Sequence, residues 1–342
     1  TDSAGNESNT LAITSFTVAT ISEITQTVVG GWPTGSFVVP SDGISFLLST
    51  FYDNNSAVAF YSLTDPDGTD ILSSSSALYG KISGSAASYG YGYGNVLVPQ
   101  SPSFSAKAGT WTFKNYASDR VKLVMRSDST PSNATIVVQP YITGTTWSAS
   151  DISEALSVMS NIYAENGITL TINSTITISD SQYASVSLTF TDSTTSALVS
   201  QGSSEAVNLF FIEDYSGDWS GVLGNAAGIP GSMKIANSWN GVLNSLTAHA
   251  TGSTLNSQLL GETAVHEMGH QLGLFHTSER GGTSFDILSD TPECAISRDS
   301  DSSGTVSAEE CDGYGADNVM FWTTWSSSSQ AAGKKSDIFS TY

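Results

Sequence analysis

Residues 266–276 read His-Glu-Met-Gly-His-Gln-Leu-Gly-Leu-Phe-His and hold three of the four histidines of the 342-residue chain. His266 and His270 are four residues apart, so on a helix their side chains lie on one face and can share a metal ion. His276 would point elsewhere if the helix continued. Gly273 can adopt the backbone conformation that ends a helix and turns the chain back. The spacing therefore predicts three imidazoles around one metal ion.

Three nitrogen ligands leave the fourth position of a tetrahedral zinc ion open for water. Zinc lowers the pKa of that water, and Glu267 is placed to take its proton as the water attacks a carbonyl. We therefore expect Zn²⁺ at His266, His270 and His276, with Glu267 as the general base. The fourth histidine, His249, has no such context, and we expect it on the surface or beside the metal ligands.

The same segment matches the elongated zinc signature of the metzincin proteases, His-Glu-x-x-His-x-x-Gly-x-x-His, and residues 141–342 resemble their catalytic domain. In that clan a methionine in a downstream turn lies beneath the metal, and Met320 in Asn318-Val-Met-Phe-Trp fits this role. Together with Ser284-Phe-Asp-Ile-Leu-Ser-Asp-Thr-Pro-Glu-Cys, this turn is most similar to the pappalysin branch. The resemblance implies a metalloendopeptidase that hydrolyses peptide bonds of extracellular proteins or peptides.

The resemblance fails at one position. Several metzincins place a tyrosine two residues after the methionine, where it helps to stabilise the oxyanion. This chain has Trp322 there. An indole N–H is a hydrogen-bond donor, and Tyr314 is a second candidate, so the sequence leaves the assisting residue open.

A second metal motif lies between the two cysteines. Residues 299–310 fit the twelve-residue calcium loop, with Gly304 at its sharp turn. Its oxygen ligands would come from Asp299, Asp301, Ser303, the Thr305 carbonyl and Glu310. We expect structural Ca²⁺ here, and the alternative is an acidic turn without an ion. In an oxidising compartment Cys294 and Cys311 can form a disulfide, whereas in the cytosol they would be free thiols.

The charge of the chain is strongly negative and unevenly spread. The net charge is −21, of which residues 1–140 carry −4 and residues 141–342 carry −17. Such a field repels nucleic acid and anionic lipid and favours calcium and basic peptides, although it can also be a solvated acidic surface. No apolar run is long enough for a transmembrane segment. We expect a secreted or cell-surface protein, and the sequence indicates no oligomeric state.

The chain divides into two halves of different character. Residues 1–140 read as short strands between turn clusters, which predicts an all-β sandwich, loosely similar to jelly-roll accessory domains. Residues 141–342 alternate helices and strands, which predicts an α/β metzincin domain with a zinc helix and a Met-turn. Within the second half, Ser150 should cap a helix that ends at Gly167, and strands should follow at 168–172 and 206–212. A Gly/Ala/Pro loop should occupy 224–231, and the zinc helix should begin near Leu259. In the first half, strands are expected at 37–39, 44–48, 57–61, 96–98, 110–113 and 121–125.

A metzincin cleft binds its substrate as an added strand, and we expect the strand around Val207–Ile212 to offer that edge. Two alternatives remain to an active protease. In the first, residues 1–140 are the inhibitory propeptide of a zymogen. In the second, the sandwich is a binding or adhesion module beside a degenerate protease domain. Every residue that the chemistry requires is present, which favours the active enzyme.

Overall fold

The computed structural model describes the chain between residues 20 and 325, with gaps. Ile44, in an expected strand, lies outside the described residues, as do three residues of the 284–294 stretch, Ile287, Ser289 and Asp290. The described residues are 20–43, 45–51, 57–73, 87–91, 93–98, 106–116, 120–126, 135–286, 288 and 291–325.

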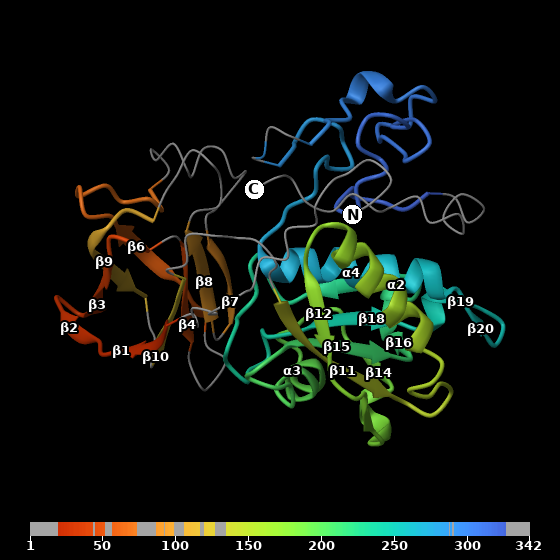
Figure 1. The fold of residues 1–342 in the computed structure, drawn as a ribbon, viewed down its shortest axis with the longest axis horizontal. Coiled ribbons are helices and arrows are strands. Elements are labelled where there is room, and N and C mark those ends of the chain that lie inside the picture. The colour runs from red at the N-terminus through yellow and green to blue at the C-terminus, as the bar shows by residue number, and fades with distance from the viewer. Residues whose placement is uncertain are drawn as a thin grey trace, which may run out of the picture.

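Two antiparallel sheets, the N-terminal sheets, are built from residues 20–126 and lie together on one side of the molecule (Figure 1). The first has the order β1 (Thr20–Ile24), β10 (Arg120–Arg126), β4 (Ser45–Phe51), β8 (Tyr93–Val98), β7 (Ala87–Tyr91), β5 (Ala57–Val58). The second has the order β2 (Thr27–Val29), β3 (Trp32–Val39), β9 (Gly109–Asn115), β6 (Phe60–Thr64). Each strand expected in this half has a counterpart among these elements.

Side chains alternate between buried and exposed along these strands, as they do when one face of a sheet is covered. In β9, Trp111 and Phe113 are buried, and the threonines beside them are exposed. The Phe46 ring of the first sheet lies 5.0 Å from both the Phe37 and the Trp111 ring of the second, measured between centroids. The two sheets therefore share one apolar core, the N-terminal core. Its members are Phe37, Val39, Phe46, Leu48, Phe60, Leu63, Ile71, Val96, Val98, Ala106, Trp111, Phe113, Val121, Leu123 and Met125.

A mainly parallel sheet forms the centre of the second half. Its order is β12 (Thr169–Ile172), β11 (Thr135–Thr143), β15 (Val207–Ile212), β18 (Val242–Ser245), β17 (Gly224–Ala226), and β13 (Ile176–Ile178) also pairs with β11. Only β17 runs antiparallel to its neighbour. Smaller pairs are β14 (Ser185–Val186) with β16 (Asp214–Tyr215), and β19 (Ala250–Thr251) with β20 (Thr254–Leu255).

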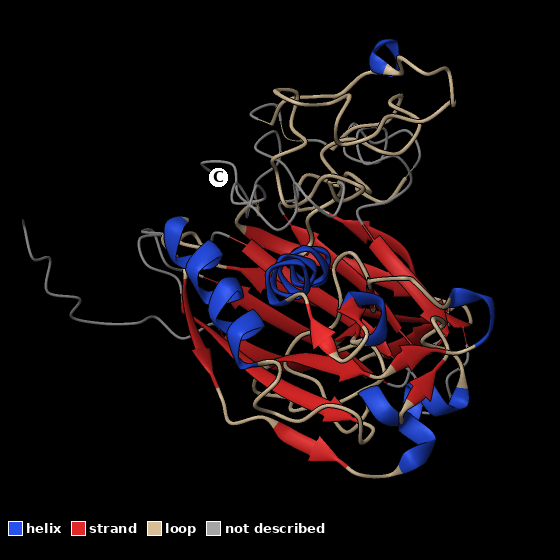
Figure 2. Ribbon diagram, turned by 90° about the vertical axis from the view of Figure 1, so that its right-hand side faces the viewer, coloured by secondary structure: helices blue, strands red, loops and turns tan. Residues whose placement is uncertain are grey.

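Helices cover both faces of this sheet (Figures 1 and 2). Helices α2 (Ser153–Glu165) and α4 (Ser257–Leu272) pack on one face, where Leu209 and Phe211 of β15 point into a helix-side core. Helix α3 (Ser193–Val199) packs on the other face, against Phe210 and Ile212. All six residues of β15 are buried because the strand is covered on both sides. Single 3₁₀ turns lie at Ser181–Tyr183, Gly217–Trp219, Thr247–His249 and Ile296–Arg298.

The position of β15 contradicts the expected substrate edge. This strand lies between β11 and β18, so its backbone groups are already paired within the sheet and Val207–Ile212 is not an edge. The edge strand next to α4 is β17, whose residues are part of the loop predicted at 224–231. Three residues without a recognisable strand pattern therefore form the edge.

Two other predictions, the boundary at residue 140 and the helix cap at Ser150, differ from the structure. Strand β11 runs through residue 140 and pairs with β12 and β15, so a division of the chain into two parts has to come before Thr135. Helix α2 begins at Ser153, after Ile152, and no side chain caps it. Ser150 instead accepts a hydrogen bond from the Ser153 hydroxyl through its carbonyl, at 2.7 Å. Among the described residues, no helix is long and apolar enough to span a membrane.

The crossing of α2 and α4 leads to a prediction about Gly261. A Cβ at this position would lie 2.7 Å from the Ala155 carbonyl oxygen and 2.7 Å from Val158 Cβ. Alanine is the better helix former by about 1 kcal/mol, but the overlap should cost about 1–3 kcal/mol. Gly261→Ala should therefore lower the melting temperature. The control is Ser157→Ala on the exposed side of α2, which should leave it within a degree or two, roughly ±0.5 kcal/mol. A Gly261→Ala protein as stable as the wild type would contradict the close packing of the helices.

Candidate metal centre and its pocket

Helix α4 positions two of the three candidate histidines. Its first turn is capped by the Asn256 side chain, which accepts a hydrogen bond from the Leu259 amide at 3.1 Å. The helix ends at Gly273, whose φ of 109° lies in the left-handed region that favours glycine. His266 and His270 lie one turn apart on the same face, with ring centroids 4.6 Å apart.

The chain reversal at Gly273 brings His276 to the same point. His276 Nε2 lies 3.2 Å from Nε2 of His266 and 3.1 Å from Nε2 of His270. Two zinc ligands at tetrahedral angles would be about 3.3 Å apart, given Zn–N bonds of about 2.0–2.1 Å. The three nitrogens are therefore spaced as ligands of one small metal ion, and they form a potential metal-binding group.

The other ring nitrogens show which form these imidazoles take. His266 Nδ1 lies 2.6 Å from the Val319 carbonyl oxygen, and His270 Nδ1 lies 2.7 Å from that of Leu274. Nδ1 of His276 lies 3.1 Å from Glu279 Oε2. Because carbonyl and carboxylate oxygens only accept, each Nδ1 is a donor, and Nε2 is the atom that presents a lone pair in the neutral ring. Three converging lone pairs fit a cation between them, and neutral imidazoles with an open fourth side are a donor set of catalytic zinc.

Burial lowers the pKa of His270 and raises the pKa of Glu267. Burial, with the nearby His276, lowers the pKa of His270 to about 3, so its lone pair is available at neutral pH. Glu267 is 8% exposed, and burial raises its pKa to about 8, against a hydrogen bond from the Ala226 backbone. Gly224 of β17 lies directly against this side chain, since a Cβ there would be 2.6 Å from Glu267 Cγ.

The turn at Asn318–Met320 connects the first and third histidines. The Asn318 side chain accepts a hydrogen bond from the Met320 amide at 2.8 Å. Besides the contact of the Val319 carbonyl with His266, the Met320 carbonyl accepts from the Thr277 amide at 3.0 Å, next to His276. Met320 is 2% exposed, and its sulfur lies so close to the backbone of α4 at Gly269 that a Cβ there would overlap it. The predicted turn thus lies against the zinc helix, and its carbonyls are contacts that the motif did not reveal.

Three further aromatic and imidazole candidates have other partners. His249 is not on the surface: it is 2% exposed, and its Nε2 lies 2.9 Å from Thr263 Oγ1 on α4. Trp322 donates its indole N–H to the Val306 carbonyl at 2.8 Å, so that group is already engaged. Tyr314 packs against the Arg298 guanidinium, 3.1 Å from its ring centroid, and does not line the pocket described next.

A pocket of about 420 Å³ opens beside His266 and Glu267. One wall is the stretch from Val222 to Gly224 that leads into β17, and the opposite wall is the segment after the Met320 turn. Glu262, one turn before His266 and 2% exposed, adds a second carboxyl group. Neither Lys nor Arg is among the described residues that line it, so the pocket is acidic. Its lining residues are Val222, Leu223, Gly224, Glu262, Thr263, His266, Glu267, Val319, Phe321, Trp322, Thr323 and Thr324.

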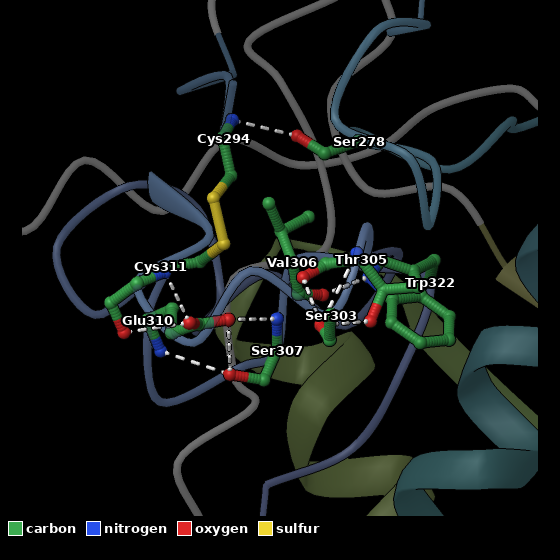
Figure 3. Close-up of a disulfide and its surroundings, with 10 residues drawn as sticks. Ser278, Cys294, Ser303, Thr305, Val306, Ser307, Glu310, Cys311 and Trp322 are labelled. Atoms are coloured by element: carbon green, nitrogen blue, oxygen red, sulfur yellow. Dashed lines mark hydrogen bonds between the residues drawn. A yellow bond between two sulfur atoms is a disulfide. The ribbon is translucent and has the colours of Figure 1, made fainter. Parts of the chain in front are cut away.

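The second predicted metal site lies in a disulfide-closed loop (Figure 3). Cys294 and Cys311 are bonded, both fully buried, with Cα atoms 5.7 Å apart. Carboxylate oxygens of Asp299, Asp301 and Glu310 lie within 4.8 Å of one another and form a potential metal-binding group. Hydrogen bonds from Ser307 and Ser300 lower the pKa of Glu310 to about 2, so it is ionised.

The loop turns sharply at Gly304, and the Ser303 and Thr305 oxygens expected as ligands lie close to each other. The amides of Ser303 and Gly304 donate to the Asp299 carboxylate at 3.0 and 2.8 Å. The Ser303 hydroxyl lies 3.1 Å from the Thr305 carbonyl oxygen. Gly304 has a φ of 80°. Through the bond from Trp322 to Val306, the loop also contacts the pocket wall (Figure 3).

Comparison with known proteins points to the same region. Residues 149–277 match the model of the metallo-peptidase family M12B, reprolysin-like. The matched segment is less than half of the chain, but it contains α2, the whole of α4 and all three histidines. The match supports a zinc metalloprotease region around the metal centre.

Several curated proteins that are named extracellular metalloproteases are similar over about half of this chain. Extracellular metalloprotease 1 of Coccidioides posadasii is 28% identical over 179 residues, which are 51% of this chain and 60% of the relative. An extracellular metalloprotease of Podospora anserina is 29% identical over 157 residues, 44% of this chain and 52% of the relative. One of Colletotrichum graminicola is 29% identical over 160 residues, 44% and 54% respectively. The chain spans little more than half the length of these relatives.

The buried carboxyl group makes the metal-free protein sensitive to pH. In the folded state the pKa of Glu267 is about 8, against an ordinary value of 4.5, so the folded state holds a proton that the unfolded state releases. This contribution to stability is complete below pH 4.5 and is lost as the pH rises through 8. Buried His249 and His270 have lowered pKa values and act in the opposite direction, but only below their ordinary value of 6.5.

Between pH 6.5 and 8, the melting temperature of the protein in a chelator should therefore fall. Glu267→Gln, which carries no ionisable group, should reduce this slope. Thermal unfolding at half-unit pH steps measures both proteins. Equal slopes for the wild type and Glu267→Gln would contradict the assignment of the pH dependence to this side chain.

Proposed function

We propose that this protein is a secreted, zinc-dependent endopeptidase of the metzincin type. The observation that carries the proposal is the convergence of three imidazole lone pairs from His266, His270 and His276 beside the buried carboxyl group of Glu267. The family match over residues 149–277 and the extracellular relatives support it. The finer assignment to the pappalysin branch rests on the turn at Asn318–Met320 and the 284–294 stretch.

In this proposal the three histidines hold Zn²⁺ and Glu267 moves protons. When bound, zinc supplies a strong electrophile that activates water and polarises the substrate carbonyl. Glu267 then accepts a proton from the attacking water and delivers it to the leaving amine. A cation nearby favours the ionised carboxylate, which offsets the effect of burial on its pKa. Gly273 and Met320 have structural roles, since Gly273 reverses the chain and Met320 packs against α4 at Gly269, between His266 and His270 in sequence.

The substrate is proposed to lie along β17. This strand is the edge of the described sheet on the side of α4, and Gly224 brings its backbone against Glu267. An extended peptide can pair with such an edge through main-chain hydrogen bonds and place one side chain in a neighbouring pocket. The pocket beside His266 is continuous with this edge, since Val222–Gly224 form one of its walls.

Residues before Thr135 are proposed to be an accessory β-sandwich rather than an inhibitory propeptide. Among the described residues, the metal-binding group contains only the three histidines, and no residue of the N-terminal sheets lines the pocket. Among the described residues of this half, no Asp or Glu side chain joins the group formed by the three histidines. These observations favour the active enzyme over the zymogen alternative.

The central test separates metal binding from proton transfer. A zinc chelator should abolish cleavage of a protein substrate. Glu267→Ala should retain one zinc per chain and lose at least about 100-fold in rate, the usual contribution of a general base. Glu154→Gln on the exposed side of α2 is the control and should keep full activity. Metal analysis and cleavage of a labelled protein measure both properties, and substantial turnover by Glu267→Ala would refute the role of Glu267.

We also propose that Asp299, Asp301, Ser303, the Thr305 carbonyl and Glu310 bind a structural Ca²⁺. Carboxylates crowded within 4.8 Å repel one another unless a cation lies between them. The disulfide of Cys294 and Cys311 closes the same loop and limits the unfolded chain. Because Trp322 is bonded to Val306 in this loop, an ordered loop keeps the pocket wall in place.

Calcium should stabilise the protein at constant zinc. At a calcium concentration of 100 times the Kd, the gain is about 2.7 kcal/mol. Asp301→Ala removes one oxygen ligand and should abolish most of this gain and lower activity. The matched control, Asp312→Ala, lies just outside the loop and should respond to calcium like the wild type. Melting curves with calcium titrated at fixed zinc measure the effect, and a midpoint that calcium does not shift would show an acidic loop without a structural ion.

A further inference from the structure

We infer that Phe275 is a positioning residue for the third metal ligand. It fastens the segment that carries His276 to the N-terminal core, so the N-terminal sheets help to form the metal centre. The inference rests on the proposed function, because it takes the three histidines as a zinc site.

The third histidine is held differently from the other two. His266 and His270 are fixed by the helix and by the carbonyl oxygens of Val319 and Leu274. His276 lies beyond the helix, and its side chain is 23% exposed. Its ring contacts Glu279, a side chain that is itself 49% exposed, at 3.1 Å. Solvent weakens such a contact, so the position of His276 depends more strongly on the backbone just before it.

Two consecutive apolar side chains, Leu274 and Phe275, anchor that backbone to two different cores. Leu274 packs against the helix-side core of the second half. Phe275 packs against the N-terminal core, and all fifteen buried members of that core come from residues 37–125. A phenylalanine ring buries a large apolar area. The residue directly before His276 therefore links it to a core more than 150 positions away in sequence.

Strand β8 of the N-terminal sheets supports the same reversal from a second direction. Gly273 lies against Leu97, because a Cβ at Gly273 would be 2.9 Å from Leu97 Cδ2. Asn95, fully buried in β8, donates to the Pro230 carbonyl and accepts from the Ser232 hydroxyl, both at 3.3 Å. The Ser232 carbonyl in turn accepts from the Gln271 side chain near the end of α4, at 2.8 Å. Figure 1 shows β8 on the side of the N-terminal sheets that faces the second half.

These contacts give the N-terminal sheets a supporting role in metal binding. Metal sites require ligand distances within about 0.2 Å, and neighbouring Cα atoms are joined at about 3.8 Å. If Phe275 loses its place in the core, the Met320 turn still holds His276 through the Thr277 amide, but the backbone before His276 loses its contact with the N-terminal core and the ligand distances shift. The N-terminal sheets then raise zinc affinity, which is the opposite of what an inhibitory propeptide does.

The experiment uses the full chain and measures metal binding rather than activity. The metal-free proteins are titrated with zinc against a chelator, and Co²⁺ substitution reports ligand geometry through its visible absorption. Phe275→Ala should weaken zinc binding about tenfold, at the lower end of the effect of removing an outer contact of a metal ligand, and should change the cobalt spectrum. Phe275→Leu, which keeps an apolar side chain in the core, should restore most of the affinity. Leu97→Ala, on β8, should also weaken zinc binding. This variant replaces Phe275→Ala in the test if Phe275→Ala does not fold.

The control for a general loss of stability is Leu63→Ala, a fully buried residue of the same core on β6. It should lower the melting temperature and leave the zinc Kd and the cobalt spectrum unchanged. Unchanged zinc affinity in Phe275→Ala, or an equal loss in Leu63→Ala, would overturn the inference. A wild-type chain that binds no zinc would instead contradict the proposed function.

Discussion

The metal centre depends on one chain reversal, at Gly273. A helix can present two ligands on one face, but a third ligand six residues further along would point away from them and lie about 9 Å along the axis. The left-handed backbone of Gly273 ends α4 and returns the chain, so that Nε2 of His276 lies 3.1–3.2 Å from the other two. Around this point, the turn at Met320, the loop at Ser232 and strand β8 all contact the last turn of α4 or the residues after it. A reversal held from several sides is rigid, as a site of three imidazoles needs.

The local elements could be predicted from the sequence, because their signals lie within a few residues. The histidine spacing, the apolar positions of α2 and the glycine that ends α4 each depend on contacts close in sequence. Strand order depends on contacts distant in sequence. The run Val207–Ile212 is apolar except for Asn208, a pattern typical of a strand covered on both faces and therefore of a central position rather than an edge.

The boundary predicted at residue 140 falls inside β11. Proline lacks an N–H and is rare inside sheets, yet Pro140 is part of this strand. In the structure, β11 pairs with β12 up to Val138 and with β13 from Tyr141, so Pro140 lies where the strand changes partners on one side. The Gln139 side chain occupies this gap, donating to the Ser174 carbonyl at 2.9 Å and accepting from Asn173 at 3.1 Å. A proline is tolerated there because no partner strand needs its amide.

The groups that tune the site come from places that no motif marks. The carbonyl oxygens of Val319 and Leu274 select the tautomers of His266 and His270, and any residue type supplies a carbonyl. Burial has opposite consequences for the two kinds of side chain on α4: it keeps His270 neutral and therefore able to bind a metal, and it holds a proton on Glu267 when no cation is near. A zinc ion would bind the neutral imidazole of His270 and would favour loss of the proton from Glu267. With a cation at the three histidines, the pKa of the Glu267 carboxyl group would fall, so metal binding and the charge of this side chain would be coupled.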